Sequence, residues 1–246
     1  MTASGPGWRS LEGLGWLSRV GASSGQTWGL AMGWRPATVR SHAARLLRAG
    51  LIRRAPRVQG RGGGLLYATA PGVLAVGVAA APLRRAPTLV SGPHHEACAQ
   101  VAAYLALRDR EMLGPRELLL EEDWVGEVEW REHGELRRRG HRPDFIVTTR
   151  QERRMAIEVE LTAKSPARLR AILGLYRGWL FEGRIDSLLY LAGTDREQRQ
   201  LHREAGACSL ELSARFGVQL LEQLTARLGD VAFDGGRVAG VEGVRR

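Results

Sequence analysis

Three acidic side chains in the second half of the chain are spaced so that they could meet at one point. Glu158 and Glu160 lie two residues apart in a segment that alternates like a β-strand, so both project from the same face. Asp144 opens another apolar segment, and a hairpin centred near residue 152 would place it opposite that pair. Such a cluster is costly unless a cation neutralises it, and carboxylate oxygens suit Mg²⁺ or Mn²⁺. The spacing predicts a divalent-metal site that could activate water for phosphodiester cleavage.

A metal-free arrangement is the alternative for the same carboxylates. They could instead pair with neighbouring arginines such as Arg142 or Arg154. Lys164 lies four residues after Glu160, so its cation could swing toward the carboxylates or point to solvent. The residues alone leave both arrangements open.

The elements that would position these residues form the order α-β-β-β-α-β. The predicted helices span 94–108 and 166–181, and the predicted strands span 124–130, 144–149, 155–161 and 187–191. The run Arg137–Arg139 is expected in a turn, and His95 and His141 are expected at the surface or as capping residues. Tyr176 is expected to pack within the second helix.

This order, with Pro143-Asp144 opening the second strand and Glu158-x-Glu160 in the third, resembles the restriction-endonuclease-like PD-(D/E)xK superfamily over residues 94–192. The resemblance implies catalytic and metal-binding roles for Asp144, Glu158 and Glu160, a catalytic cation from Lys164, and Glu96 on the preceding helix as a fourth metal ligand. The superfamily places lysine where this chain has Glu160, although some restriction enzymes work with glutamate there.

Positive charge is concentrated in the N-terminal third. The whole chain carries +10, but residues 1–90 hold 12 arginines and a single acid, Glu12, whereas residues 91–246 hold 24 basic and 25 acidic residues. A small domain with this excess attracts phosphate strongly. Double-stranded DNA is the expected partner, and a small acidic ligand is not.

The first 80 residues show three helical patterns followed by a hairpin. The helices are expected over 11–20, 26–32 and from Pro36 to Gly50, where proline suits the first turn and glycine ends the helix. Residues 52–58 and 65–69 flank a glycine-rich tip and predict a basic hairpin. This order predicts a winged helix-turn-helix, and the segment from Thr38 to Ile52 resembles the recognition helix of MarR-like regulators.

The major groove of DNA is wide enough to admit an α-helix, so the third helix of that domain is the part expected to contact DNA bases. The third helix would offer Arg35, Thr38, Arg40, Ser41 and Arg45 to base edges or phosphates, and the wing would offer Arg53, Arg54, Arg57 and Arg61.

The two halves together resemble the replication-relaxation family of plasmids and integrative conjugative elements, over residues 10–192. The resemblance rests on HRPDFIVTT, MAIEVELTAKSPARLRAILGLYRGWL and IDSLLYLAG. It implies a role in plasmid replication or as an accessory factor to a relaxase, with a relaxase or replication protein as a further partner. A site-targeted, Mg²⁺-dependent endonuclease and a winged-helix transcriptional regulator are the alternatives.

The expected organisation is an α/β (α+β) chain of two domains. It comprises a winged helix-turn-helix domain at 1–80, a proline-containing linker at 81–93, a nuclease-like domain at 94–225 and a tail at 226–246. Two distant cysteines indicate neither a disulfide framework nor a zinc site. No signal peptide or membrane segment is expected, so the prediction is a cytoplasmic protein, with a homodimer possible for reading two half-sites.

Overall fold

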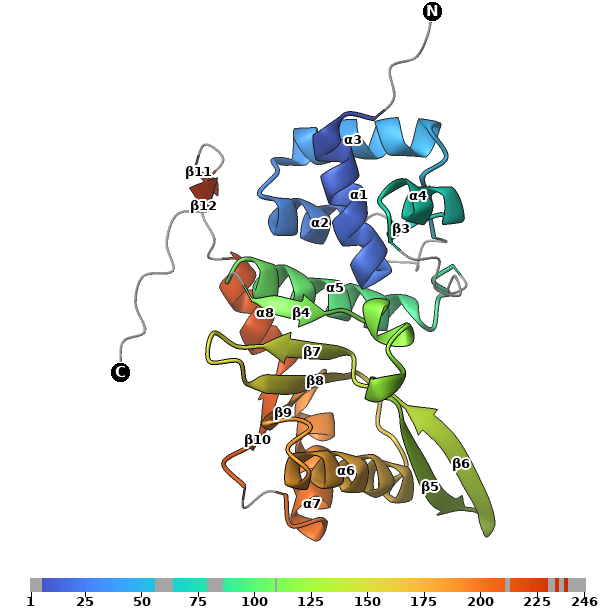
Figure 1. The fold of residues 1–246 in the computed structure, drawn as a ribbon, viewed down its shortest axis with the longest axis vertical. Coiled ribbons are helices and arrows are strands. Elements are labelled where there is room, and N and C mark those ends of the chain that lie inside the picture. The colour runs from blue at the N-terminus through green and yellow to red at the C-terminus, as the bar shows by residue number, and fades with distance from the viewer. Residues whose placement is uncertain are drawn as a thin grey trace, which may run out of the picture. The chain divides into compact units, whose positions relative to one another are not determined.

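The computed structural model describes residues 6–55, 64–78, 86–108, 110–210, 213–229, 233–234 and 237–238 (Figure 1). The chain is a mixed α/β protein. It divides into two compact units, one made of Met1–Asp109 with Thr225–Arg246 and the other of Arg110–Leu224. Arg57 and Arg61, which the sequence predicted to lie in a DNA-binding wing, are outside the described residues.

The first unit begins with three helices and a small sheet. Its elements are α1 (Trp8–Val20), β1 (Ala22–Ser23), α2 (Gly25–Met32), α3 (Pro36–Arg48), β2 (Ile52–Arg54), β3 (Leu66–Ala68), α4 (Ala70–Ala75) and α5 (Gly92–Ala106). The three predicted helices and the two strands of the predicted hairpin are confirmed, with the first strand ending earlier than expected. Sequence reasoning missed β1 and α4, because two and six residues are too short to display a period.

Local signals explain where α3 begins and ends. Pro36 occupies its first turn, and Gly50 follows its C-terminus with φ of 69°. The Leu51 N–H then bonds back to the Leu46 carbonyl at 3.0 Å, which satisfies an end carbonyl of the helix. The chain thus turns directly from α3 into β2.

The three strands of the first unit pair antiparallel in the order β1-β3-β2. Ile52 lies opposite Ala68, and Ala22 lies opposite Tyr67. Leu14 and Leu17 from α1 and Leu46 from α3 are fully buried. The sheet and the helices therefore share one apolar core.

The second unit is built on a five-stranded sheet with the order β10-β9-β8-β7-β4. Its elements are β4 (Glu111–Leu113), the short 3-10 helices η1 (Glu117–Leu119) and η2 (Glu122–Trp124), β5 (Gly126–Glu132), β6 (Glu135–His141), β7 (Phe145–Thr148), β8 (Arg154–Glu160), α6 (Pro166–Phe181), β9 (Ser187–Ala192), α7 (Asp195–Ala207) and β10 (Phe216–Leu220). Strands β4, β7 and β8 run antiparallel, whereas β8, β9 and β10 run parallel.

The predicted strand at 124–130 is confirmed as β5, which pairs with β6 among the described strands, and β4 lies beside β7. One expectation for this unit is wrong. The run Arg137–Arg139 lies within β6 and not in a turn. The turn falls at His133 and Gly134, which adopt φ of 52° and 83°. Gly134 favours this tight hairpin, because glycine tolerates a positive φ. Strand β4 was not predicted, because its few residues show too little alternation between apolar and polar side chains.

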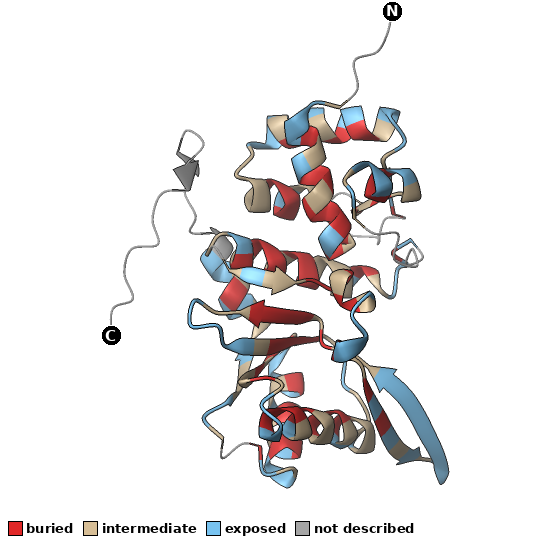
Figure 2. Cartoon of the chain, viewed as in Figure 1, coloured by how far each residue is buried: buried red, intermediate tan, exposed pale blue. Residues whose placement is uncertain are grey.

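One face of the five-stranded sheet is covered by α6 and α7. The covering core includes Leu173 and Tyr176 of α6, Leu201 of α7, and Ala156 and Leu188 of the sheet. Helix α6 has the predicted bounds, since its apolar positions recur at helical spacing. Strand β6 is exposed from Glu135 to Gly140 (Figure 2).

After β10 the chain forms α8 (Leu221–Gly229) and the pair β11 (Phe233–Asp234) and β12 (Arg237–Val238). Within the described ranges, no helix has both the length and the apolar content needed to cross a bilayer.

Candidate functional site

Helix α3 presents a basic face. Val39, Ala43 and Leu46 are buried, and the opposite arc exposes polar and small residues. The exposed residues are Arg35, Pro36, Ala37, Arg40, Ser41, Ala44, Arg45 and Arg48, with Thr38 half-buried. The structure thus leaves accessible all the residues predicted on this helix. Arg48 was missing from that prediction, although its helical spacing from Ser41 places it near the middle of the exposed arc.

Arg45 is held toward α1 through a serine. Its Nη1 donates to Ser10 Oγ at 3.4 Å, and Ser10 Oγ lies 2.7 Å from Nδ1 of His42. The His42 ring stacks on Trp34 with centroids 4.3 Å apart. Burial lowers the pKa of His42, and the positive charges of Arg45 and Arg9 lower it further. The lowered pKa favours the neutral imidazole over the charged form. Arg45 lies at the α1 side of the basic face.

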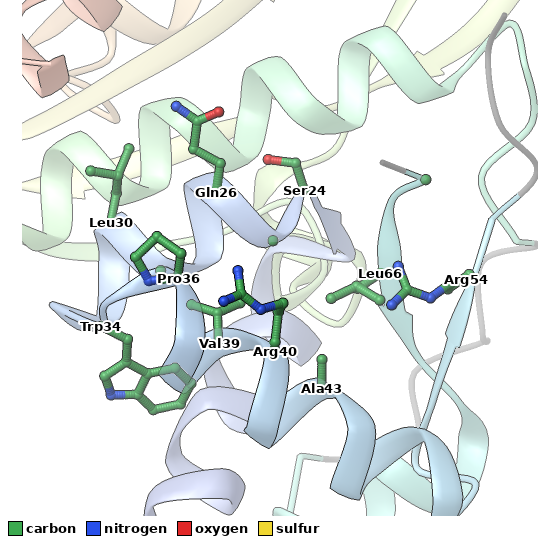
Figure 3. Close-up of a pocket in the computed structure, with 13 residues that line it drawn as sticks. Ser24, Gln26, Leu30, Trp34, Pro36, Val39, Arg40, Ala43, Arg54 and Leu66 are labelled. Atoms are coloured by element: carbon green, nitrogen blue, oxygen red, sulfur yellow. The ribbon is translucent and has the colours of Figure 1, made fainter. Parts of the chain in front are cut away.

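The hairpin adds two exposed arginines, Arg53 and Arg54 on β2. Arg54 and Arg40 line the same pocket, which has a volume of about 770 Å³ and lies between α2, α3 and the two hairpin strands (Figure 3). Helix α3 and the hairpin therefore present cations around one hollow.

Glu96 belongs to the first unit and is engaged there by α2. Its carboxylate accepts hydrogen bonds from the Ser24 N–H at 2.6 Å, the Ser24 hydroxyl at 2.8 Å and the Thr27 hydroxyl at 2.6 Å. A negative charge at a helix N-terminus is favourable, because the first N–H groups of the helix lack helical partners and can donate to it. The metal-ligand role of Glu96 stays a prediction, and the observed contacts are those of a structural tie between α5 and α2.

The predicted hairpin that carries the carboxylates is confirmed. Strand β7 pairs antiparallel with β8, and Phe145 lies opposite Ile157. This register places Asp144 at the position across from Glu158. The Asp144 Oδ2 atom accepts the Val159 N–H at 2.8 Å, so one carboxylate oxygen extends the strand pairing. Asp144 is thus bonded to the backbone between the two glutamates.

Glu158 and Glu160 are both buried, and each contacts a different potential cation. Glu158 Oε1 accepts a short hydrogen bond from the Tyr176 hydroxyl and lies 3.0 Å from His141 Nε2. Glu160 pairs with Lys164. Lys164 therefore points toward the carboxylates, which was one of its two predicted orientations.

The two glutamates contact His141 and Lys164, which differ from the arginines named for the metal-free alternative. Arg154 instead donates from Nη2 to the Gly183 carbonyl at 2.9 Å. The expectation that His141 is a surface or capping residue is wrong, because β6 directs it at Glu158. If residues 137–139 had been recognised as part of a strand that ends at His141, the alternation of side chains along that strand could have predicted which way His141 points. Tyr176 is fully buried as expected, and its hydroxyl also donates a hydrogen bond to Glu158.

Tyr190 brings a second buried hydroxyl to this region. It lies opposite Glu158 in the β8–β9 register and is 1% exposed. Among the described residues its hydroxyl has no hydrogen-bond partner. Burial raises the pKa of Tyr190 well above its usual range, and the charges of Glu158, Glu160 and Asp144 raise it further. Burial also raises the pKa of Glu160, against the opposing effect of Lys164.

The metal-binding role of Asp144, Glu158 and Glu160 stays a prediction. Among the residues that the structure describes, Asp144, Glu158 and Glu160 do not form a group whose ligand oxygens all lie within 4.8 Å of one another. Protein groups already contact both glutamates, with His141 at Glu158 and Lys164 at Glu160. The arrangement is a buried polar network in which protein groups contact each carboxylate.

No protein-family model, no curated protein and no solved structure matches this chain. The geometry of the two units is therefore the basis for assigning a function.

Proposed function

We propose that this protein binds double-stranded DNA through its first unit, which we interpret as a winged helix-turn-helix. The order α1-β1-α2-α3-β2-β3, with three antiparallel strands, supports this interpretation. In such domains the helix that corresponds to α3 enters the major groove and the hairpin contacts the adjacent backbone. The resemblance noted in the sequence over Thr38 to Ile52 agrees with that assignment.

The observation that carries the proposal is the placement of unpaired arginines on two neighbouring elements. Arg40 and Arg48 on α3 and Arg53 and Arg54 on β2 are exposed, and no ion pair with a carboxylate is found for any of them among the described residues. Residues 1–90 contain one acid, Glu12, so little local charge opposes phosphate. Phosphate contacts by arginine provide affinity, and contacts to base edges provide sequence preference.

Fluorescence anisotropy with a labelled duplex of arbitrary sequence tests this proposal. Replacing Arg40 and Arg48 by alanine should weaken binding at moderate salt by about tenfold or more, because each lost phosphate or base contact costs on the order of 1 kcal/mol. The matched control replaces Arg196 and Arg199, which are exposed on α7, and removes the same charge from the second unit. Equal weakening by both variants, or no duplex binding by the wild-type protein, would overturn the proposal.

A metal-dependent DNA endonuclease is the second candidate, and the register that sets Asp144 across from Glu158 favours it. Mg²⁺ or Mn²⁺ would be the cofactor. Incubation of supercoiled plasmid with the protein and either ion tests this activity. Nicking that disappears in Asp144→Ala supports it, and an inert protein that still binds duplex excludes it.

A narrower role, in replication or as a relaxase accessory factor on a mobile element, follows only from the sequence resemblance to the replication-relaxation family. A transcriptional regulator would use the same DNA-binding face. Genes for a relaxase or a coupling ATPase beside this one would favour the first role, and an adjacent operon bound at its promoter would favour the second.

A further inference from the structure

Strand β6 of the second unit leaves one of its two edges open. Among the described strands it pairs with β5 alone, and residues 135–140 are exposed (Figure 2). Glu132 and Glu135 flank a two-residue turn, and in such a hairpin the flanking residues form a hydrogen-bonded pair that recurs at every second position. The N–H and carbonyl groups that point away from β5 therefore belong to Leu136, Arg138 and Gly140. An open row of this kind can pair with a further strand.

Helix α6 holds this hairpin in place. Val128 of β5 is buried, and a Cβ on Gly126 would collide with the side chain of Leu175 in α6. The guanidinium carbon of Arg168, also in α6, lies 5.5 Å from the centroid of the Trp130 ring. Strand β5 is thus packed on the helix and carries β6 as an outer strand. A strand that is already ordered loses little conformational freedom when a partner strand pairs with it.

The side chains of β6 lie on two faces that differ in charge. Arg138 on one face is neutralised by two glutamates of β5, with Glu127 Oε1 at 3.3 Å from its Nε and Glu129 Oε1 at 2.6 Å. Arg137 and Arg139 project from the other face, since successive strand residues alternate. Arg137 pairs with one glutamate of its own strand, and Arg139 has no ion pair among the described residues. The face of Arg137 and Arg139 therefore carries an excess of positive charge.

A second copy of this chain does not fit the open edge. An antiparallel pair of β6 strands centred on Arg138 would set Arg138 against its own copy and Arg137 against Arg139. Like charges directly opposite each other destabilise a pair of strands. Charged residues on an edge strand are a common protection against such self-pairing. The charge of β6 therefore selects an acidic partner strand.

A nucleic acid also fits this edge less well than a peptide does. The hairpin from Gly126 to His141 contains four arginines and four glutamates, so with neutral histidines it carries no net charge to attract phosphates. Phosphate oxygens accept hydrogen bonds but cannot donate to the outward-pointing carbonyls. Leu136 on this edge is 58% exposed and offers apolar contact. A peptide strand can satisfy the N–H groups, the carbonyls and the leucine together.

We propose that the outer edge of β6 binds an extended acidic segment of a partner protein, which adds to the hairpin as a third, antiparallel strand. Main-chain hydrogen bonds to Leu136, Arg138 and Gly140 would provide affinity, and acidic side chains at alternate positions beside Arg137 and Arg139 would provide specificity. The interaction uses none of the residues assigned to DNA contact, so it does not depend on the proposed function.

Fluorescence anisotropy of labelled peptides with the full chain tests this inference. The probe is the capped peptide Ser-Glu-Val-Glu-Val-Glu-Val-Glu-Ser, whose valines would lie opposite the open backbone groups when its glutamates lie beside the arginines. One control peptide has serine in place of every glutamate. The other has proline in place of the central valine, which keeps the charge but removes a pairing N–H. The acidic peptide should bind, and each control should bind about tenfold more weakly or worse.

Protein variants and hydrogen exchange locate the site. Replacing Arg137 and Arg139 by glutamine should weaken the acidic peptide by about fivefold or more. Replacing Arg196 and Arg199 on α7 by glutamine removes the same charge from the same unit and should leave peptide binding unchanged. Amide hydrogen exchange measured by NMR should slow at the three outward-pointing N–H groups when the acidic peptide binds.

The possible outcomes separate this inference from the DNA-binding proposal. Absent binding of the acidic peptide, equal binding of the proline peptide, or unchanged exchange at the three amides overturns the strand-addition site even where duplex binding is intact. Loss of duplex affinity in the Arg137 and Arg139 variant, with peptide affinity intact, would make this edge a nucleic-acid surface and also overturn the inference. A dimer in analytical ultracentrifugation that the same variant dissociates would assign the edge to a second copy instead.

Discussion

Glu96 Oε2 accepts the backbone N–H of Ser24 at 2.6 Å, and this contact ties α5 to the start of α2. The same carboxylate also accepts hydrogen bonds from the hydroxyls of Ser24 and Thr27. A single acid in α5 therefore fixes the N-terminus of the helix that precedes α3.

Removal of this acid should destabilise the first unit. Glu96→Ala leaves three donors without their acceptor, and hydrogen bonds to charged groups contribute about 1.5–3 kcal/mol, so we expect a loss of roughly 2–3 kcal/mol in the free energy of unfolding. Urea denaturation followed by circular dichroism measures it. Glu12→Ala removes an exposed acid and should change stability by less than about 0.5 kcal/mol. Similar losses for the two variants would show that the Glu96 contacts are not formed.

Two glycines of α1 should respond to alanine in opposite directions. A Cβ at Gly13 would lie 2.9 Å from Cζ2 of Trp28 and would also collide with Trp34, whereas nothing lies within 4 Å of a Cβ at Gly15. Gly13→Ala should lower the free energy of unfolding by about 1–3 kcal/mol, because overpacking forces the tryptophans to move. Gly15→Ala should raise it by about 0.5–1 kcal/mol through helix propensity. Thermal denaturation of both variants checks the signs, and a stabilising Gly13→Ala would contradict the packing described.

The buried tyrosines of the second unit offer a similar contrast. Tyr176 donates to Glu158, but the Tyr190 hydroxyl has no partner among the described residues. Tyr176→Phe should cost about 1.5–3 kcal/mol, and Tyr190→Phe should be neutral or stabilising because it removes a buried polar group that lacks a hydrogen bond. Chemical denaturation of the two variants measures the difference. A large loss in Tyr190→Phe would mean that this hydroxyl has a partner in solution.

His42 should make the first unit sensitive to mild acid. Its pKa is lowered in the folded state by burial and then by Arg45 and Arg9, from an ordinary value of 6.5. The unfolded chain therefore takes up a proton first as pH falls below 6.5, so the contribution of His42 to stability is present above that value and is lost through the window down to its lowered pKa.

Thermal denaturation between about pH 7.5 and about pH 5.5 tests this effect. Wild-type protein should lose more stability over that range than His42→Gln. His133→Asn, at an exposed turn position, serves as the control and should keep the wild-type slope. Identical slopes for wild type and His42→Gln would contradict the described environment of the imidazole.

The sequence predicted those elements correctly whose apolar residues repeat at a regular spacing or whose ends are marked by proline or glycine. Pro36 and Gly50 mark the ends of α3, and the two-residue spacing of Glu158 and Glu160 placed them on one buried face. It failed at β4, β6 and His141, because pairing partners and register depend on contacts distant in the sequence. The pocket at Arg40 and Arg54 was also missed, since no local pattern indicates that a helix and a strand enclose a hollow.

The salt dependence of duplex binding tests the central claim most directly. The logarithm of the association constant falls with the logarithm of salt concentration by about 0.9 for each phosphate neutralised. Wild-type protein should show a steep slope, and replacing Arg40 and Arg48 by glutamine should make it shallower by up to about 2, whereas the Arg196 and Arg199 replacements on α7 should leave it unchanged. A flat wild-type slope, or equal slopes for wild type and the α3 variant, would contradict DNA binding through α3.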